Sequence, residues 1–551
     1  MKKQIIIHSH FYQPPRENPN TLKIETEYSA MPFNNWNERI TAECYRANSA
    51  SRYLDETNHI KKIINNYEFM SFNIGPTLLS FLEKNYKEVA ERIKEADRIS
   101  VEKYTEGNAI AQSYNHTILP LDDEDFARSQ IRGALYVFKK FFSRDSKGFW
   151  CPECAISKSV IDILFEEGVQ FTVLSPLQIE KLKIGKEIIE RDKIEPKHLC
   201  RPFWIKGKKH KIAAFFYNKD LSSEISFNHL LRDANNFYSR IKNIADNGSD
   251  VVIAATDGEI YGHHEPFGDM AFAALTEKVK ERKEFTFTNF ATFLKQHPPK
   301  DEAILIEGED NKGSSWSCSH GVSRWYKDCG CHTGGGENWN QKWRTPLRRA
   351  LNSAKREVTQ NVENILNQKG KGYSLLDFVE ILDKVKNLDK DVKNALLAYK
   401  WMSYSFTSCA WFFSDISGIE TIHNIGYMIK ALDMLSMDDT KQKFINSLKS
   451  AKSNVNTMRD GKTIAERIID VYFKPKSSDE IIEAITKNGI NKENTITLLD
   501  NITIRGLSPN SGEYFETQNT VYEAIKNKRY EKSNELMILL EVLNISKNVF
   551  R

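Results

Sequence analysis

Five consecutive apolar residues, Val251-Val252-Ile253-Ala254-Ala255, run directly into the polar segment Thr256-Asp257-Gly258-Glu259. Apolarity without alternation predicts a strand buried on both faces, because a half-exposed strand would place a polar residue at every second position. Similar runs recur between helical stretches, at residues 5–7, 69–72, 148–150, 171–174 and 212–216. Buried strands that alternate with amphipathic helices, such as 75–96 and 157–167, predict a parallel α/β barrel.

Polar side chains follow the predicted strands where each one ends. They are His8, His10, Asn73, Glu153, Ser175, Tyr217 and Asp257. Barrel enzymes carry their chemistry at the carboxyl ends of the strands, so these positions predict the functional site.

Two of these residues, Glu153 and Asp257, are carboxylates. Cleaving or transferring a glycosidic bond with retention needs one ionised carboxylate that attacks the anomeric carbon. It also needs one protonated carboxyl that gives its proton to the leaving oxygen. The chain offers a candidate for each role. The plainer alternatives are a solvated loop carboxylate at Glu153 and a turn at Asp257-Gly258-Glu259.

The length of 551 residues predicts more than one unit, because single cores stop growing well below that size. We expect a catalytic barrel over residues 1–300, a helical region with aromatic and Gly-rich loops over 301–420 that completes the cleft, and a helical C-terminal domain over 421–551. The predicted helices of the second half are 345–368, 375–401, 419–436, 438–454, 463–473 and 519–543.

The charge of the chain is nearly balanced, with 78 basic and 74 acidic side chains and a formal net charge of +4. We therefore expect neither nucleic acid nor an anionic membrane as a partner. No apolar stretch long enough for a signal or membrane segment follows Met1, so we expect a cytoplasmic protein. Eight cysteines spread over so long a chain do not form a disulfide framework, which predicts free thiols.

Two segments of the second half, 314–344 and 408–415, are rich in aromatic residues. Aromatic clusters on loops favour surfaces that stack on sugars, and the candidates are Trp316, His320, Trp325 and Trp411. The alternative is that Trp411 belongs to the core between barrel and helices, and that single histidines such as His320 are hydrogen-bonded structural residues. Three glycines, 334–336, suggest a loop that closes over a cleft.

Cys151 and Cys154 flank Glu153 in a Cys-x-x-Cys spacing. That spacing alone is typical of half a zinc site or of a redox pair, and Cys329 and Cys331 are available as a second half. A zinc ion bound by both thiols beside Glu153 would crowd that carboxylate. We therefore interpret Cys151 and Cys154 as small buried hydrophobic residues, and we expect no metal and no cofactor.

Several segments, taken in order and with their separations, resemble glycoside hydrolase family 57. They are His-Ser-His-Phe-Tyr-Gln-Pro at 8–14, Phe-Asn-Ile-Gly-Pro-Thr-Leu at 72–78, Gly-Phe-Trp-Cys-Pro-Glu at 148–153 and Ala-Thr-Asp-Gly-Glu-Ile-Tyr-Gly-His-His at 255–264. The resemblance covers roughly the first 300 residues. Further segments at 315–321, 343–348 and 407–413 are similar to the subgroup with a long C-terminal region of unassigned function.

The resemblance implies an incomplete (β/α)7 barrel and retaining chemistry on α-glucans, by hydrolysis or by transfer or branching. It places Glu153 at the position of the nucleophile and Asp257 at that of the general acid/base. The pKa of Asp257 would then have to be raised, and like-charge repulsion from Glu153, and from Glu259 if it lies nearby, would raise it.

The resemblance also implies the residues that bind substrate. His10 and Gln13 match positions that contact the sugar near the cleaved bond. Weaker matches are His8, His116, His263, His264 and Trp316, and Asn73 and Glu259 complete the set through their places beside the other site residues.

Two alternatives come from other classes of protein. A metal-dependent hydrolase would use His8, His10, Asp257 and His263 as ligands, but it leaves Glu153 without a role. A carbohydrate-binding homologue would keep the barrel and lack turnover. Loss of activity with a chelator favours the first alternative, and sugar binding without product favours the second.

Overall fold

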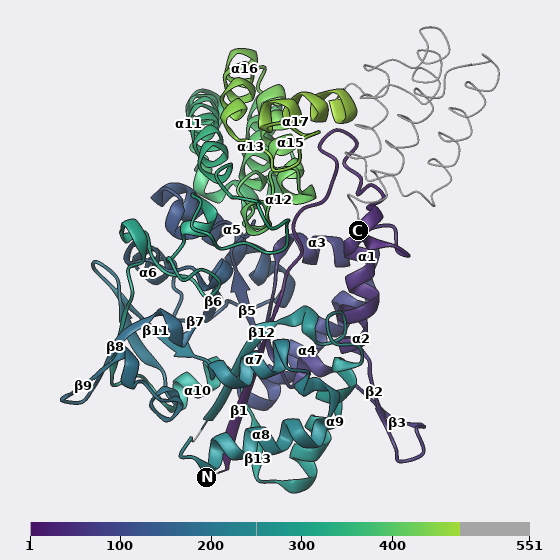
Figure 1. The fold of residues 1–551 in the computed structure, drawn as a ribbon, viewed down its shortest axis with the longest axis vertical. Helices are drawn as coiled ribbons and strands as arrows, with labels where there is room; N and C mark the ends of the chain where they lie inside the picture. The colour runs from purple at the N-terminus through teal and green to yellow at the C-terminus, as the bar shows by residue number, and fades with distance from the viewer. Residues whose placement is uncertain (1, 250, 474–551) are drawn as a thin grey trace.

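The computed structural model describes residues 2–249 and 251–473, and these form a mixed α/β part followed by a helical part (Figure 1). The predicted helix 519–543, with the rest of the predicted C-terminal domain from 474 on, lies outside the described residues. None of the helices in the described ranges is long and apolar enough to cross a membrane.

A row of parallel strands forms the centre of the α/β part. Its order is β12 (Val251–Asp257), β1 (Lys3–Phe11), β4 (Ser71–Ile74), β5 (Ala109–Gln112), β6 (Gly148–Trp150), β7 (Phe171–Leu174) and β11 (Lys211–Phe216). Strand β13 (Phe285–Phe287) adds to β1, also in parallel. The six predicted strands are confirmed, whereas β5 was missed because its Ala-Ile-Ala-Gln sequence carries little apolar signal.

A mainly antiparallel extension continues the sheet beyond β11. It consists of β10 (Phe203–Lys206), β14 (Glu302–Leu305), β8 (Ile179–Ile184) and β9 (Glu187–Glu190), with β10 and β14 paired in parallel. A separate hairpin pairs β2 (Ser51–Leu54) with β3 (Ile60–Ile64). Neither feature was predicted, since both consist of short, partly exposed strands without a continuous apolar run.

Helices connect the parallel strands. They are α1 (Trp36–Ile40), α2 (Arg46–Ser49), α3 (Pro76–Asn85), α4 (Lys87–Tyr104), α5 (Glu124–Phe142), α6 (Lys158–Glu166), α7 (Lys219–Phe227), α8 (Ala234–Asp246), α9 (Gly268–Arg282) and α10 (Phe290–Gln296). Pro76 begins α3, where its missing N–H costs nothing, and the Asp123 side chain caps α5. The predicted helix 75–96 is broken, because Tyr86 has an extended φ of −140° between α3 and α4.

The described chain from residue 344 on is helical and covers one end of the α/β part (Figure 1). Its helices are α11 (Arg344–Lys369), α12 (Phe378–Lys384), α13 (Lys390–Tyr404), α14 (Cys409–Phe412), α15 (Ile419–Met434), α16 (Asp438–Ser447) and α17 (Gly461–Ile468). Aromatic contacts join the two parts, with Phe378 against Tyr114 and Phe406 against Phe126. The two parts therefore share one continuous apolar core.

A buried ion pair ties α4 to the sheet. Asp97, which is 1% exposed, accepts two hydrogen bonds of 2.8 Å from the Arg144 guanidinium and a third from the Ala109 N–H at the start of β5. Removing one partner of such a pair leaves an uncompensated charge, which costs far more than a surface ion pair contributes.

We expect Asp97→Asn to lower the free energy of unfolding by about 3 kcal/mol, because Arg144 loses its charged partner. Denaturant unfolding measures the change. Glu95→Gln on the same helix is the control, since Glu95 meets Arg98 at the surface, and its midpoint should match that of the wild type. Equal midpoints for both variants would contradict this account of the pair.

Candidate active site

The parallel register brings the predicted residues to one end of the sheet. His10 on β1 pairs with Asp257 on β12 and with Asn73 on β4. The Trp150 ring at the end of β6 stacks on both His8 and His10, with ring centroids 4.9 and 5.0 Å apart. Residues from four strands thus meet at the carboxyl ends, where the sequence predicted a site.

Glu153 lies in the turn after β6 with its backbone in the left-handed region, at φ 58°. Such a conformation is costly for a residue with a Cβ and is typical of functional sites. The turn is held by Trp316, whose backbone N–H donates to the Glu153 carbonyl at 3.0 Å. A segment far along the chain therefore determines where this carboxylate points.

Two donors hold the Glu153 carboxylate. Its Oε2 accepts from the Trp316 indole Nε1 at 3.0 Å and from the Ser317 Oγ at 2.7 Å. On balance the pKa of Glu153 is raised, because burial outweighs these two hydrogen bonds and the nearby Arg324 charge, which lower it. The donors thus favour the ionised form of this carboxyl.

Asp257 has the opposite environment. Burial raises its pKa to about 8, and the negative charges of Glu259 and then Glu153 act in the same direction. The Asp257 side chain nevertheless remains accessible to solvent. Because its pKa lies above neutrality, Asp257 is protonated at pH 7. The Glu259 charge contributes more to this shift than Glu153 does, although the sequence analysis had placed Glu153 first.

Glu259 is a third carboxyl in the same site. Its Oε1 accepts from the Tyr45 hydroxyl at 2.7 Å and, more weakly, from the Tyr12 N–H at 3.4 Å. Burial raises the pKa of Glu259 to about 7, and the Tyr45 hydrogen bond opposes this change. Tyr45 also links Glu259 to Gln13, whose Nε2 donates to the Tyr45 hydroxyl at 3.3 Å.

The histidines of the site form a buried, uncharged row. Burial lowers the pKa values of His8 and His10 to about 3, and it lowers the pKa of His116 as well. Asn73 joins the first two, with its Oδ1 3.0 Å from His8 Nε2 and its Nδ2 2.8 Å from His10 Nδ1. His10 Nε2 lies 3.2 Å from His116 Nε2. His116 Nδ1 in turn lies 2.7 Å from the Ser408 hydroxyl.

The remaining predicted residues divide into three groups. His263 pairs with Glu43 and is half-buried, whereas His264 is exposed beside it. Trp325 and Trp411 are 0% exposed and pack around Arg348, so they offer no face to a sugar. His320 lies with three cysteines in the loop that follows Trp316.

The structure adds residues that the sequence analysis did not single out, namely Tyr45, Ser317 and Arg324. Ser317 could have been found from its place next to Trp316. Tyr45 and Arg324 lie in helical segments without a recognisable motif, and only the fold brings them to the carboxyl groups.

The proposed metal ligands His8, His10, Asp257 and His263 do not converge. Within residues 2–249 and 251–473, the one group of His, Cys, Asp or Glu side chains whose ligand atoms gather closely enough for an ion is that of His320 and the cysteines. The nitrogens of His8 and His10 face Ser71, Asn73 and His116 instead.

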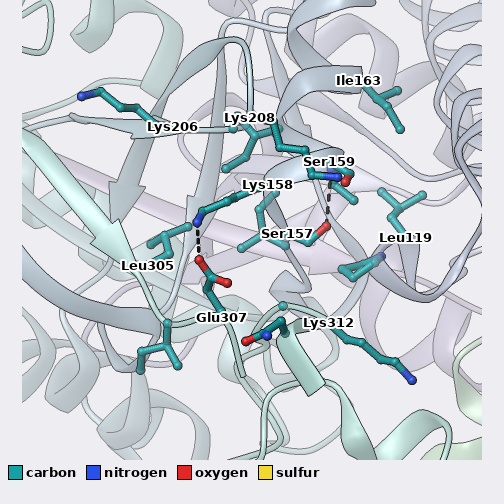
Figure 2. Close-up of a pocket in the computed structure, with 18 of the residues that line it drawn as sticks. Leu119, Ser157, Lys158, Ser159, Ile163, Lys206, Lys208, Leu305, Glu307 and Lys312 are labelled. Carbon is teal, nitrogen blue, oxygen red and sulfur yellow. Dashed lines mark hydrogen bonds and ion pairs between the residues drawn. The ribbon is translucent and has the colours of Figure 1, made fainter. Parts of the chain in front are cut away.

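A separate surface pocket of about 660 Å³ lies near the start of α6 (Figure 2). Its lining includes Ser157, Lys158, Lys206 and Glu307, and Lys158 forms an ion pair with Glu307 across it. The pocket contains none of the predicted site residues, and we do not assign the chemistry to it.

Comparison with known proteins gives matches along most of the chain. The model of glycosyl hydrolase family 57 matches residues 4–306, and a domain of unknown function (DUF3536) matches residues 389–477. A 1,4-alpha-glucan branching enzyme of Thermococcus kodakarensis is 21% identical over 316 residues, which cover 53% of this chain and 43% of that enzyme. The chain therefore matches less than half the length of this relative.

Solved structures show the same fold at low identity. An exo-type maltose-forming amylase of Pyrococcus sp. ST04 superposes with a TM-score of 0.62 at 15% identity, covering 92% of this chain and 96% of that one. A 4-alpha-glucanotransferase of Thermococcus litoralis gives a TM-score of 0.50 at 12% identity, covering 78% of this chain and 60% of that one.

The class of protein that fold and site define is a glycosyl hydrolase. The family match spans more than half of the chain, and the protein belongs to glycosyl hydrolase family 57, which confirms the resemblance found in the sequence. The second match agrees with the predicted C-terminal region of unassigned function.

The three carboxyl groups predict a specific titration. Carbodiimide activates protonated carboxyl groups, so labelling of Asp257 should persist to about pH 8 and fall above it. Glu259→Gln removes a negative charge, which lowers the pKa of Asp257, so labelling should end at lower pH. Mass spectrometry of the Asp257 peptide measures this.

Glu281→Gln is the matched control, because Glu281 is an exposed carboxylate on α9 outside the site. In the Glu281→Gln variant, labelling of Asp257 should depend on pH as it does in the wild type. A curve centred at the ordinary pKa of Asp, about 4, in the wild-type protein would contradict the raised pKa.

Proposed function

We propose that this protein is a retaining glycosidase or transglycosidase of α-glucans. One observation carries the proposal: two carboxyl groups share a site in opposite environments. Glu153 accepts hydrogen bonds from Trp316 and Ser317, which favour its ionised form. Burial and neighbouring charges keep Asp257 protonated at neutral pH. Retaining catalysis needs such a pair.

In the proposed first step, Glu153 attacks the anomeric carbon while Asp257 donates its proton to the oxygen of the leaving sugar. The bond to the leaving sugar breaks, and a glycosyl ester forms on Glu153. The esterified Glu153 no longer carries a negative charge, so the pKa of Asp257 falls. Asp257 then takes a proton from water or from an acceptor hydroxyl as that oxygen attacks the anomeric carbon. The ester bond to Glu153 breaks, which releases the sugar and restores the Glu153 carboxylate.

The proposed sugar contacts come from His10, Gln13 and Trp316. The uncharged state of His10 suits a neutral sugar, because no imidazolium charge is left unpaired beside the substrate. The Trp316 ring meets Trp150 edge-on, at a centroid distance of 5.2 Å. The α-glucan substrate is inferred from the relatives, which are a branching enzyme, an amylase and a glucanotransferase.

We further propose that the parallel strands form an incomplete (β/α)7 barrel. The Asn218 N–H, just beyond β11, donates to the Ile253 carbonyl of β12 at 2.7 Å. This hydrogen bond supports the close approach of β11 and β12, the first and last strands of the parallel row. In this proposal residues 1–300 are the catalytic unit and 301–420 complete the cleft. The contact of Trp316 with Glu153 supports the second assignment. Of the predicted C-terminal unit 421–551, the described residues up to 473 are helical, and the rest lies outside the described residues.

Glu153→Gln should abolish turnover, because an amide cannot form the glycosyl ester. The measurement is the product profile from a linear malto-oligosaccharide, by mass spectrometry. Shorter and longer chains made by the wild type alone indicate transfer, and shorter chains alone indicate hydrolysis. Turnover at the wild-type rate by Glu153→Gln would remove this residue from its role.

Asp257→Asn serves as the matched second variant. It should form the glycosyl enzyme slowly, and only from substrates with good leaving groups, because these need no proton. Intact-protein mass spectrometry then shows the trapped ester. If the malto-oligosaccharide stays unchanged in every sample, the result would favour a carbohydrate-binding protein without turnover.

Trp316→Phe should move the acidic limb of the kcat/KM profile to higher pH. Phe keeps an aromatic ring, but Glu153 loses an N–H donor, so the pKa of Glu153 rises. On acidification the variant therefore loses the active, ionised form of Glu153 at a higher pH than the wild type does. A hydrogen bond to a charged group is worth about 1.5–3 kcal/mol, which corresponds to a shift of about one pH unit or more.

Trp204→Phe is the control for this variant. Trp204 lies on β10 in the antiparallel extension, so the acidic limb should stay in place. An acidic limb that is unchanged in Trp316→Phe would show that the indole N–H does not act on Glu153.

A further inference from the structure

Three cysteines and one histidine converge in the loop between β14 and α11. Cys318, His320, Cys329 and Cys331 each offer one ligand atom, and the four atoms all lie within 4.8 Å of one another. Cys318 Sγ lies 3.9 Å from Cys329 Sγ, and Cys331 Sγ lies 3.6 Å from His320 Nδ1. Cys318 is buried and the other three are half-buried.

These distances can be compared with the edges of a metal tetrahedron. A zinc–sulfur bond of about 2.3 Å gives an edge of about 3.8 Å between two sulfur atoms, and a slightly shorter edge between sulfur and nitrogen. The two measured separations match these edges. All other separations among the four ligand atoms are at most 4.8 Å, so small side-chain adjustments would bring the four atoms around one ion.

We propose that Cys318, His320, Cys329 and Cys331 bind a structural zinc ion with four protein ligands. Two sequence pairs supply them, Cys-x-His and Cys-x-Cys. Gly330 lies between the second pair with φ +79°, and this turn lets both thiols point to one centre. Four protein ligands leave no open position for water, which is the pattern of a structural rather than a catalytic zinc.

The charges around the cluster suit a bound zinc ion. Three thiols release their protons to solvent on binding, so Zn²⁺ with three thiolates and a neutral imidazole carries one net negative charge. Two buried arginines lie beside the loop. Arg344 donates to the Cys331 carbonyl at 2.8 Å, and Arg324 donates to the Ser317 carbonyl at 3.2 Å. Both bond carbonyl groups rather than carboxylates here, so the anionic zinc centre would offset their charge.

The position of the cluster indicates which part of the protein the ion would stabilise. Cys318 directly follows Ser317, which donates to the Glu153 carboxylate, and Trp316 precedes both. Between β14 and α11 the chain contains only short helical turns such as Ser323–Trp325, so a further constraint on this segment would help to hold these two donors in place. Zinc supplies that constraint, because it joins the segment after Ser317 to the segment at 329–331.

This site differs from the pairing considered in the sequence. Cys151 and Cys154 are buried and lie outside the group of ligand atoms, so they keep the interpretation of small buried hydrophobic residues. Cys329 and Cys331 find their partners in Cys318 and His320 instead.

The test is the metal content of full-length protein grown with added zinc and purified without chelators. Elemental analysis should find one zinc ion per chain. Titration of the thiols with an organomercurial should release that zinc, which a chromogenic chelator detects. Replacement by Co²⁺ should give the visible bands of a tetrahedral ion and a thiolate charge-transfer band.

Cys331→Ser and His320→Ala should each lower the zinc affinity by about tenfold or more. Cys200→Ser is the matched control, since Cys200 lies far from the loop and contacts Ser249, and it should keep the full zinc content. If the ligand variants fail to fold, mercurial release and Co²⁺ spectra of the wild type still test the site.

Three results would overturn the proposal. The first is wild-type protein with less than about a tenth of a zinc ion per chain that also binds no Co²⁺. The second is iron with inorganic sulfide in place of zinc. The third is a disulfide between Cys318 and Cys329, found as a loss of two thiols in denatured, unreduced protein.

Discussion

The site depends on two carboxyl groups that share one site and favour opposite charge states. Burial alone would neutralise both, because it raises the pKa of each. The difference comes from hydrogen bonding: Glu153 accepts from an indole and a hydroxyl, while Asp257 faces the charges of Glu259 and Glu153. The donors to Glu153 therefore matter as much as the carboxyl groups themselves.

Those donors lie outside the strands that carry the carboxyl groups. Trp316 and Ser317 belong to the loop that joins the α/β part to the helices, and this loop is anchored on α14 by Arg324, which donates to the Phe412 carbonyl at 2.7 Å. The helical part thus supports the site through the loop. A zinc ion at the four ligands beyond Ser317 would add a second anchor, and both anchors act on the same short segment.

The row of uncharged histidines is the second feature that burial determines. His8, His10 and His116 stay neutral because burial disfavours the charged imidazolium and lowers the pKa of each ring. Asn73 sets their orientation by offering its oxygen to one ring and its amide nitrogen to the next. The result is a rigid polar wall beside the carboxyl groups, with hydrogen-bonding groups but no net charge.

The sequence alone predicted the six buried strands, the meeting of Glu153 and Asp257 at the strand ends, and the family, because continuous apolar runs and short motifs are local properties of the chain. It did not predict β5, the break at Tyr86 or the antiparallel extension, where the local signal is weak. The sequence analysis considered Cys151 and Cys154 as partners of Cys329 and Cys331 but interpreted the first two as small buried hydrophobic residues, and it assigned no role to Cys318, Tyr45 or Arg324. These contacts join segments that are far apart in the sequence. Packing of the whole core determines which segments lie close together in space, and no local pattern encodes that packing.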